Sequence, residues 1–459
     1  MKFGGSVLKG SSGVLRASEV TKRFVDEHSC ILVASALQGV TDELERMADL
    51  ASAGEEEELR KEIKELLVKH EDVARDALHS RARLSEALDL IQGKIEELER
   101  LLMATSVLRE TTPRTRDMIL SFGEALSGII FHQALLDAGV KAERFMGGEA
   151  GIVTDEAFGE ASPLMNVTKA KVSSKLGPLL QSGVTPLVAG YTGETQRGEV
   201  TTLGRGGSDY AATILAACLG ADEVWIWGEA DGIMTCDPNV AGEPKVIPGL
   251  SYVEAMEMAF FGVRKIHPRA FEPLLDTGQP VRIRNIYNLD HTGTLISKDN
   301  LVNGTVVKAI ALVRDVGLIT VNGVVLVDKP GTAARIFDVL GKTGVNMIMI
   351  SQSASEASIS VIVRRDLLHK AVSALEIATL GKGVVDSVNS EDDVCVIVVV
   401  GAGMKGTPGV ASKVFGAIAS VGVNIRMIAQ GSSELNISFA IKEVDAIRSV
   451  RALKEAFNL

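Results

Sequence analysis

Two hydrophobic patterns alternate along the first two thirds of the chain. Short continuous apolar runs, such as Ile31–Ala34 and Val224–Trp227, are typical of strands that are buried on both faces of a parallel sheet. Between these runs, apolar residues recur every third or fourth position, and this spacing predicts helices over about 13–27 and across 55–103. The alternation predicts an α/β domain built on an open, mainly parallel sheet.

The same reading places further elements around a glycine-rich turn. An apolar run ends at Tyr191 and predicts a strand that enters the turn, and a helix is expected directly after it. The remaining expected elements are a helix over Met118–Leu136, a strand over Pro186–Tyr191, a hairpin loop over Gly193–Gly198, a helix over Tyr210–Leu219, and strands over Val281–Ile286 and Gly293–Ile296. The acidic run Glu55–Glu58 lies where a helix N-terminus favours negative charge, so we interpret it as a solvated capping region.

The last third of the chain contains an internal repeat. Residues 330–360 align without a gap to residues 408–438, and both copies contain Gly-Val-Asn, then Gln, then Ser-Glu, then Ile-Ser. Each copy follows the order strand, helix, strand, strand, helix, which is the βαββαβ pattern of a ferredoxin-like sandwich.

The two copies differ in how they obtain their last strand. The first copy closes with an apolar strand near Val384–Val385, whereas the second ends on a helix and would leave a sheet edge open. The apolar segment Val306–Val313 could fill that edge, so we expect the first repeat to be inserted within the second. The expected domains are 1–300, 315–390, and 306–313 together with 393–459.

Composition and charge narrow the class of protein. The chain is 46% apolar and 23% charged, and its net charge of −11 argues against a nucleic-acid-binding surface. Its four cysteines (Cys30, Cys218, Cys236 and Cys395) are far apart and beside apolar residues, so they are interpreted as buried side chains in a reducing compartment. No apolar run long enough to span a membrane and no secretion signal is expected, which favours a cytoplasmic location and no membrane partner.

The glycine-rich turn carries the most specific chemistry. Residues 201–209 place one cation, Arg205, and one carboxylate, Asp209, among three glycines just before a helix. Glycines let backbone N–H groups approach an anion, and the positive end of the following helix points to the same place. The turn therefore predicts a site that holds a small zwitterion beside a phosphate, as in a phosphotransferase that acts on an amino acid.

Several motifs in this order resemble those of the aspartate kinases, in which an amino-acid kinase fold is followed by two ACT domains. The resemblance covers nearly the whole chain. The motifs are Lys2-Phe3-Gly4-Gly5, Ser35-Ala36 with Gly39-Val40-Thr41, Ser121-Phe122-Gly123-Glu124, residues 202–209, and the paired Ser-Glu-x-x-Ile-Ser repeats. The family transfers the γ-phosphoryl group of ATP, with Mg²⁺ present, to the β-carboxylate of L-aspartate. This is the first step in making lysine, threonine and methionine.

The resemblance implies roles for individual residues. Arg205 would bind the α-carboxylate of aspartate, and Glu124 and Asp209 would receive its α-ammonium group. Lys2 would bridge the transferring phosphate oxygens. The amides of Gly4, Gly5 and Ser6 would bind phosphate, and Ser35, Thr41 and Ser208 would complete the substrate site. The alternatives are a merely solvated Lys2, an Arg205 paired structurally with Asp209 or Glu124, and ordinary turn or cap roles for Ser35 and Thr41.

The nucleotide half departs from the family pattern. Where the family usually has Thr-Asp, then Tyr, then Arg, this chain has Gly228-Glu229, Met234 and Asn239. Arg264 stands where the family usually has Lys, and it could still neutralise phosphate. The base-side contacts are therefore expected to be altered.

The repeats imply regulation and assembly. Four amides, Asn346, Gln352, Asn424 and Gln430, lie where ACT domains commonly hold an amino-acid effector, with lysine or threonine the usual inhibitors in the family. Buried amides that serve only as hydrogen-bond partners are the alternative. A homodimer formed through the ACT domains is expected.

The sequence leaves two other functions open. One keeps the fold and changes the acceptor to another small carboxylate or phosphate, although a nucleotide acceptor would leave Asp209 without an amino group to bind. The other is an amino-acid sensor in which the altered nucleotide pocket no longer binds ATP.

Overall fold

The structure is a computed structural model that describes residues 1–261, 266–298, 305–323, 331–353, 358–380 and 385–459. The chain divides into two compact units. The first contains Met1–Ile233, Pro248–Tyr252 and the described residues of 265–299, and the second contains Met234–Ile247 and the rest of the described chain. Each is described by itself.

The first unit is built on an eight-stranded sheet in the order β3-β5-β2-β1-β8-β10-β11-β9. Neighbouring strands are parallel except for β10 and β11, which run antiparallel. The strands are β1 (Lys2–Phe3), β2 (Leu32–Ala34), β3 (Ala142–Phe145), β5 (Thr185–Ala189), β8 (Val224–Gly228), β9 (Gly249–Ser251), β10 (Val281–Asn285) and β11 (Thr294–Ser297). The open, mainly parallel sheet expected from the sequence is confirmed.

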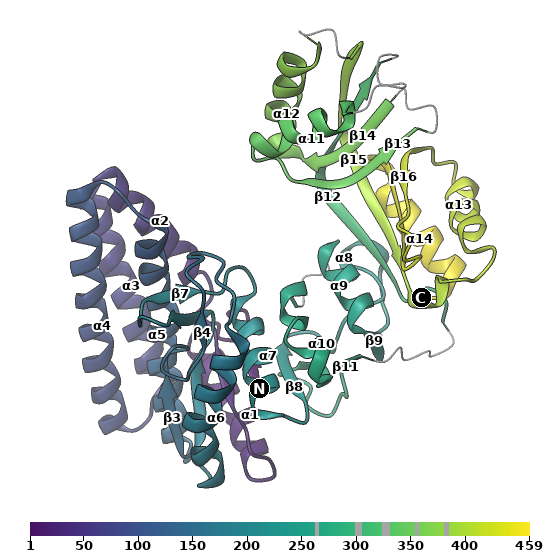
Figure 1. The fold of residues 1–459 in the computed structure, drawn as a ribbon. Helices are drawn as coiled ribbons and strands as arrows, with labels where there is room; N and C mark the ends of the chain where they lie inside the picture. The colour runs from purple at the N-terminus through teal and green to yellow at the C-terminus, as the bar shows by residue number, and fades with distance from the viewer. Residues whose placement is uncertain (262–265, 299–304, 324–330, 354–357, 381–384) are drawn as a thin grey trace. The chain divides into compact units, whose positions relative to one another are not determined.

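Helices lie on both faces of this sheet. Helices α1 (Gly10–Val25) and α5 (Pro113–Asp137) contact each other on one face, and α6 (Met165–Gln181) and α7 (Gly207–Leu219) contact each other on the opposite face. Outside α5, the helices α2 (Val40–Ala53), α3 (Glu56–Ala77) and α4 (Arg81–Leu108) lie side by side (Figure 1). The predicted surface helices are therefore confirmed, with residues 56–58 in the first turn of α3 as expected.

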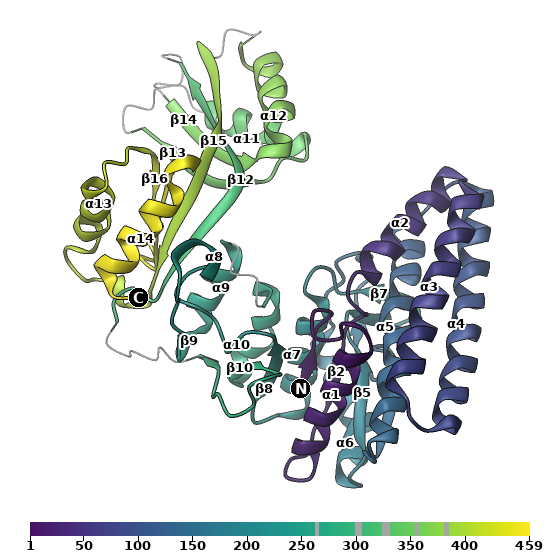
Figure 2. The ribbon, with the colours of Figure 1, turned by 180° about the vertical axis from the view of Figure 1, so that it is seen from behind.

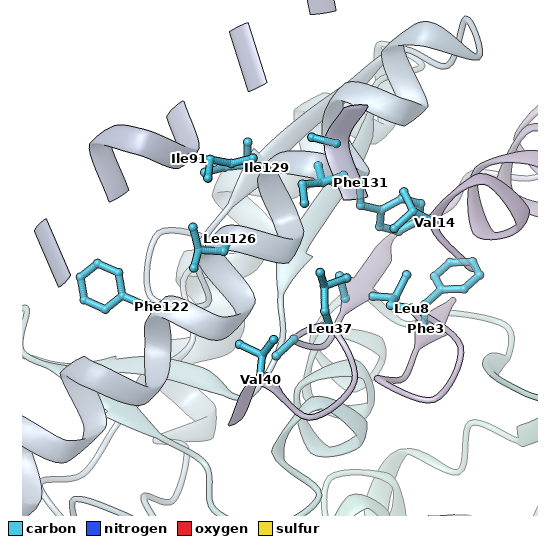
Figure 3. Packing of buried hydrophobic residues seen from close by; sticks show 14 of the residues in the cluster. Phe3, Leu8, Val14, Leu37, Val40, Ile91, Phe122, Leu126, Ile129 and Phe131 are labelled. Carbon is cyan, nitrogen blue, oxygen red and sulfur yellow. The ribbon is translucent and has the colours of Figure 1, made fainter. Parts of the chain in front are cut away.

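The core of this unit lies between the sheet and α5. Phe122, Leu126 and Ile129 of α5 belong to one buried cluster with Ile91 of α4 and with Phe3 and Leu8 of the N-terminal segment, and Ile129 lies beside Ile91 (Figure 3). Because α5 is apolar on nearly every side, it is also long and apolar enough to cross a membrane, which corrects the expectation that no such segment exists. However, 89% of its most apolar 18-residue stretch is buried inside the protein.

A small second sheet lies within the first unit. It consists of β4 (Val153–Thr154), β6 (Thr192–Thr195) and β7 (Val200–Thr202) in the order β4-β6-β7. The expected hairpin loop over 193–198 is therefore wrong at its start, because residues 192–195 form a strand and the turn begins after them. Short helical segments η1 (Pro268–Phe271) and α10 (Leu274–Thr277) complete the described part of the unit.

The second unit contains one six-stranded sheet in the order β13-β14-β12-β15-β17-β16. Its strands are β12 (Ala309–Asn322), β13 (Met347–Gln352), β14 (Ser358–Arg364), β15 (Ser387–Val400), β16 (Ile425–Ala429) and β17 (Asn436–Lys442). Its helical elements are α8 (Pro238–Ala241), α9 (Tyr252–Phe260, whose first residue is counted with the first unit), α11 (Thr332–Lys342), α12 (Arg365–Ala378), η4 (Ala402–Met404), α13 (Val410–Ser420), η5 (Glu443–Asp445) and α14 (Ala446–Phe457).

Two long strands join the two repeats. The first half of β12, Ala309–Val313, pairs with the end of β15, and its second half, Val316–Asn322, pairs with both β14 and the beginning of β15 (Figure 2). The segment expected as a separate strand at 306–313 is thus part of one continuous strand. The strand expected near Val384–Val385 begins instead at Ser387, and Val384 lies outside the described residues.

Candidate functional site

A cleft opens where the parallel strands of the first unit end. Strands β1, β2 and β5 run in the same direction, so the loops after them meet at one edge of the sheet, which is where open α/β sheets bind ligands. The cleft has a volume of about 650 Å³, a size suited to a small molecule. The predicted residues that line it are Lys2, Gly5, Ser6, Ser35, Thr41, Glu124, Arg205, Ser208 and Asp209.

Lys2 and Asp209 form an ion pair in the cleft. The Lys2 Nζ lies 2.6 Å from Asp209 Oδ1, and each side chain is 11% exposed. Lys2 is on β1, and Asp209 is in the first turn of α7, where the helix dipole favours a carboxylate. Without a ligand, the two charges neutralise each other.

Glu124 is a buried acid on α5. Its side chain is 3% exposed, and its Oε2 has no hydrogen-bond partner among the described residues. Burial raises the pKa of Glu124 to about 8, against the opposing effect of backbone hydrogen bonds and of the Lys2 charge. A bound cation would favour the ionised form of this carboxyl group.

Arg205 lies on a tightly packed loop but is itself exposed. The flanking Gly204 and Gly206 have positive φ angles of 75° and 72°, and a Cβ on Gly206 would stand only 2.2 Å from the Cβ of His267. Only glycine fits there. Among the ion pairs between described residues none includes Arg205, and Asp209 pairs with Lys2 instead. The alternative of a structural pair between Arg205 and Asp209 or Glu124 is therefore not observed.

Three hydroxyl residues complete the described wall of the cleft. Ser35 follows β2, and its backbone is held by Phe3 O at 3.0 Å and by the Ser127 hydroxyl at 2.7 Å. Thr41 is half-buried in the first turn of α2, and Ser208 is buried in the first turn of α7. All three are positioned by main-chain structure.

The N-terminal loop forms a tight turn beside Lys2. The amides of Val7 and Leu8 both donate to Gly4 O at 2.9 Å. A Cβ on Gly4 would come within 3.1 Å of Lys2 Nζ, and one on Gly5 within 3.2 Å of Ala36 O. Gly4 thus lies directly behind the cleft, while Gly5 and Ser6 line it.

The described residues predicted to contact the base side of the nucleotide do not line the cleft. Gly228 ends β8 and Glu229 follows it, exposed, in the first unit, whereas half-buried Met234 and exposed Asn239 belong to the second unit. None of these four lines the cleft, and Arg264 lies outside the described residues.

The four predicted effector amides lie on or beside the two outer strands of the six-stranded sheet in the second unit. Asn346 and Asn424 directly precede β13 and β16, Gln352 ends β13, and Gln430 directly follows β16. All four side chains are exposed in the single chain, so they are not the buried structural amides of the alternative interpretation. The four cysteines, in contrast, are all buried, as expected.

Sequence reasoning missed several residues that line the cleft, among them Gln38, Asp42, Glu45, Glu160 and Tyr191. Tyr191 has a φ of 68°, which is unusual for a residue other than glycine, and burial raises its pKa to about 12. Its position directly after the strand that enters the glycine turn was the available signal.

Comparisons with known proteins identify the family of each domain. Residues 1–285 match the amino acid kinase family model, and residues 319–378 and 397–457 match an ACT domain model. The chain is 32% identical to aspartokinase 1, chloroplastic, of Arabidopsis thaliana over 100% of the chain and 79% of the relative.

Solved structures give the same result. The chain resembles E. coli aspartokinase III in complex with aspartate and ADP at a TM-score of 0.81 and 27% identity, covering 100% of this chain and 99% of that one. It resembles the same enzyme in complex with lysine and aspartate at a TM-score of 0.84 and 27% identity, covering 99% and 98% of the two chains. The chain therefore belongs to the amino acid kinase family, and within it to the aspartokinases, with C-terminal ACT domains.

Proposed function

We propose that the chain transfers the γ-phosphoryl group of ATP to the β-carboxylate of L-aspartate and releases ADP and 4-phospho-L-aspartate. The observation that carries the proposal is the grouping of two cations, Lys2 and Arg205, with two acids, Glu124 and Asp209, in one cleft at the carboxyl edge of the sheet. The aspartokinases that the chain resembles give the substrate class.

The amino-acid half of the cleft explains how aspartate would be held. The guanidinium of Arg205 has two parallel N–H groups for the α-carboxylate, and Asp209 and Glu124 supply negative charge for the α-ammonium. Ser35, Thr41 and Ser208 add hydroxyl groups along the same wall. The β-carboxylate then faces the N-terminal loop as an oxyanion that needs no general base.

In phosphoryl transfer the protein mainly aligns the two substrates and stabilises the charge that develops in the transition state. Binding of both substrates would separate Lys2 from Asp209, so that Lys2 bridges the transferring phosphate oxygens and Asp209 binds the ammonium. The amides of Gly5 and Ser6, with Gly4 behind them, would hold phosphate oxygens. Gly228, Glu229, Met234, Asn239 and Arg264 stay the proposed contacts for the rest of the nucleotide.

Mg²⁺ fits this site as an ion that arrives with the nucleotide. Among the described residues, no group of three or more His, Cys, Asp or Glu side chains could hold a metal ion by itself. Mg²⁺ usually keeps several waters and takes one or two carboxylates plus substrate phosphates. It would neutralise charge on the phosphates, while the residues above orient the acceptor.

The proposed regulation follows from the second unit. An amino-acid effector would bind beside β13 and β16 through Asn346, Gln352, Asn424 and Gln430, and two copies of the chain would pair through their ACT domains. The cytoplasmic location expected from the sequence stays a prediction, since the Arabidopsis relative is named chloroplastic.

A coupled assay for ADP release tests the function. With wild-type protein and either ATP or GTP, L-aspartate should stimulate ADP or GDP formation, and Arg205→Ala should reduce kcat/KM by about a hundredfold or more. Lys9→Ala, which changes an exposed cation outside the cleft, is the matched control.

The same assay separates the two alternative functions. Turnover with another small carboxylate but not with aspartate would assign a different acceptor. Amino-acid binding by calorimetry, with no nucleotide binding and no turnover, would identify a sensor. Intact Lys2, Glu124, Arg205 and Asp209 in one cleft favour the kinase over both.

A further inference from the structure

Asp117, a buried acid outside the cleft, joins two segments of the first unit. It is on α5 and is only 1% exposed. Its Oδ2 accepts hydrogen bonds from the amides of Thr202 at 2.8 Å and Gly159 at 3.0 Å, and its Oδ1 accepts one from the Thr202 hydroxyl at 2.7 Å. A carboxylate buried this deeply is tolerated only when its oxygens are hydrogen-bonded, so the two segments are held firmly to α5.

Arg269 joins the same two segments through their carbonyl groups. From η1, its Nη1 donates to Leu203 O at 3.0 Å, and its Nη2 donates to Ala161 O at 3.3 Å. The guanidinium also lies over the ring of Tyr210, 4.9 Å from the centroid, which fixes its plane. The Asp117 carboxylate thus accepts hydrogen bonds from the N–H groups of residues 159 and 202. The Arg269 guanidinium donates hydrogen bonds to the C=O groups of residues 161 and 203.

The joined segments lead directly into the loop that carries Arg205. A backbone hydrogen bond from Ala161 N to Thr202 O, 2.9 Å long, links them between the two charged side chains. Gly204 follows at once, and a Cβ there would lie 3.1 Å from the Cγ of Glu160. The loop therefore has little freedom to shift, although the Arg205 side chain itself is exposed.

We infer that Asp117 and Arg269 are positioning residues, which together set the place of Arg205 in the cleft and thereby the affinity for the amino-acid substrate. The inference rests on the proposed function. Neither residue lines the cleft, so both act through the backbone of residues 202–204. Burial raises the pKa of the Asp117 carboxyl group and its three hydrogen-bond donors oppose that rise, consistent with donors arranged around an acceptor.

The first test compares Asp117→Ala with Asp117→Asn in the full-length chain. Alanine removes every acceptor, so the KM for L-aspartate should rise by about tenfold or more while the KM for the nucleotide changes less than about twofold. Asparagine should restore most of the affinity, because its oxygen can accept both amides and its NH₂ can donate to the Thr202 hydroxyl. A general loss of structure would not raise the KM for aspartate while leaving the KM for the nucleotide unchanged.

The second test approaches the same loop from the other side. Arg269→Met should also raise the KM for aspartate selectively, and Arg269→Lys should recover only part of it, since lysine lacks the planar fork. Asp155→Asn is the matched control. The Asp155 Oδ1 accepts from Ala157 N and Ser162 N in the same loop but makes no bond to residues 202–203, so both KM values should stay near those of the wild type.

The outcomes separate this inference from the proposed function. Failure of the wild type to form ADP with aspartate would overturn the function. If the wild type is active, the inference alone is overturned when folded Asp117→Ala and Arg269→Met keep the wild-type KM for aspartate, or when they raise the KM for the nucleotide as much as the KM for aspartate. If Asp117→Ala does not fold, Thr202→Val replaces it with the same expected direction. This change removes the 2.7 Å hydroxyl contact with Asp117 and also the side-chain hydrogen bond between Thr202 and Tyr191, so Tyr191→Phe serves as the control for the second contact.

Discussion

Each unit contains an ion pair between a lysine and an acid, and the two pairs differ in their surroundings. In the first unit, Lys2 and Asp209 are 2.6 Å apart at the wall of a cleft, and each is 11% exposed. In the second unit, Lys308 and Glu254 are 2.9 Å apart, and they are only 4% and 0% exposed. Glu254 also accepts a 2.8 Å hydrogen bond from the amide of Ala402.

The difference in burial distinguishes an ion pair whose charges can each bind a ligand from an ion pair that stabilises the fold. The Lys308–Glu254 pair connects α9 to the residue that directly precedes β12, and Glu254 also binds η4. Neither residue lines any of the three described pockets. The Lys2–Asp209 pair borders a cleft large enough for substrates, so new partners can take over both charges. The same two chemical groups thus serve stability in one unit and, we propose, catalysis in the other.

The largest expected effect is on the buried pair. Glu254→Gln removes the negative charge that faces the buried Lys308 ammonium and should lower the free energy of unfolding of the second unit by about 3–5 kcal/mol. Hydrogen exchange of β12 and β15 peptides, measured by mass spectrometry, would report the loss. The double variant Glu254→Leu with Lys308→Met should recover much of it, and equal exchange in all three proteins would contradict the comparison.

The cleft pair should behave in the opposite way. Lys2→Met or Asp209→Asn should reduce kcat/KM for aspartate by roughly 100- to 1000-fold, because each removes a charge that faces a substrate in the transition state. The unfolding temperature should change little. Steady-state kinetics and a thermal melt on the same preparations check this, with Lys9→Met as the control for loss of an exposed cation. A stability loss as large as that of Glu254→Gln would remove the distinction between the pairs.

The amino-acid half of the cleft could be predicted because its chemistry is concentrated in short stretches of sequence. Arg205, Asp209 and three glycines stand within residues 201–209, and glycine spacing carries direct information about close backbone approach. Strand β12 could not be predicted as one element, because a fourteen-residue strand shared by two halves of a sheet looks like two separate apolar runs. Asp117 and Glu254 were missed because each is only one of the acids on its helix, and the partners that distinguish it from the others are far away in sequence.

A third prediction concerns the buried acid of the cleft. Because the pKa of Glu124 is raised to about 8, its carboxyl group is protonated at neutral pH in the free chain, and binding of an ammonium group must release that proton. Affinity for aspartate should then rise by up to about tenfold per pH unit as pH increases toward 8. Calorimetry in buffers of different ionisation enthalpy measures the proton release, which Glu124→Gln should abolish and Glu45→Gln, a change at an exposed acid of the same cleft, should preserve.

Ionisation of Glu124 should also affect stability, and here a rise in pH should be unfavourable. A carboxyl group with a raised pKa stabilises the folded chain fully below its unfolded-state pKa of 4.5, and this contribution is lost as pH rises through about 8. The unfolding temperature of the wild type should therefore fall relative to that of Glu124→Gln between these two values. An unchanged difference across this range would contradict the burial argument.

The smallest effect is expected at an exposed pair, which extends the comparison to the surface. Arg364 and Asp366 lie in the second unit and are 67% and 57% exposed. Arg364→Ala should change the free energy of unfolding by less than about 1 kcal/mol, because water screens the pair. Urea unfolding followed by circular dichroism would check this, and a loss comparable to that of Glu254→Gln would show that burial does not govern the energetics.

Comparison of L-aspartate with succinate, which lacks only the α-amino group, tests the central claim most directly. If Asp209 binds the α-ammonium group, the wild type should prefer aspartate strongly in kcat/KM, and Asp209→Asn should lose most of that preference by lowering the rate with aspartate alone. Equal use of both acceptors by the wild type, or an undiminished preference in Asp209→Asn, would contradict the proposed arrangement of the cleft.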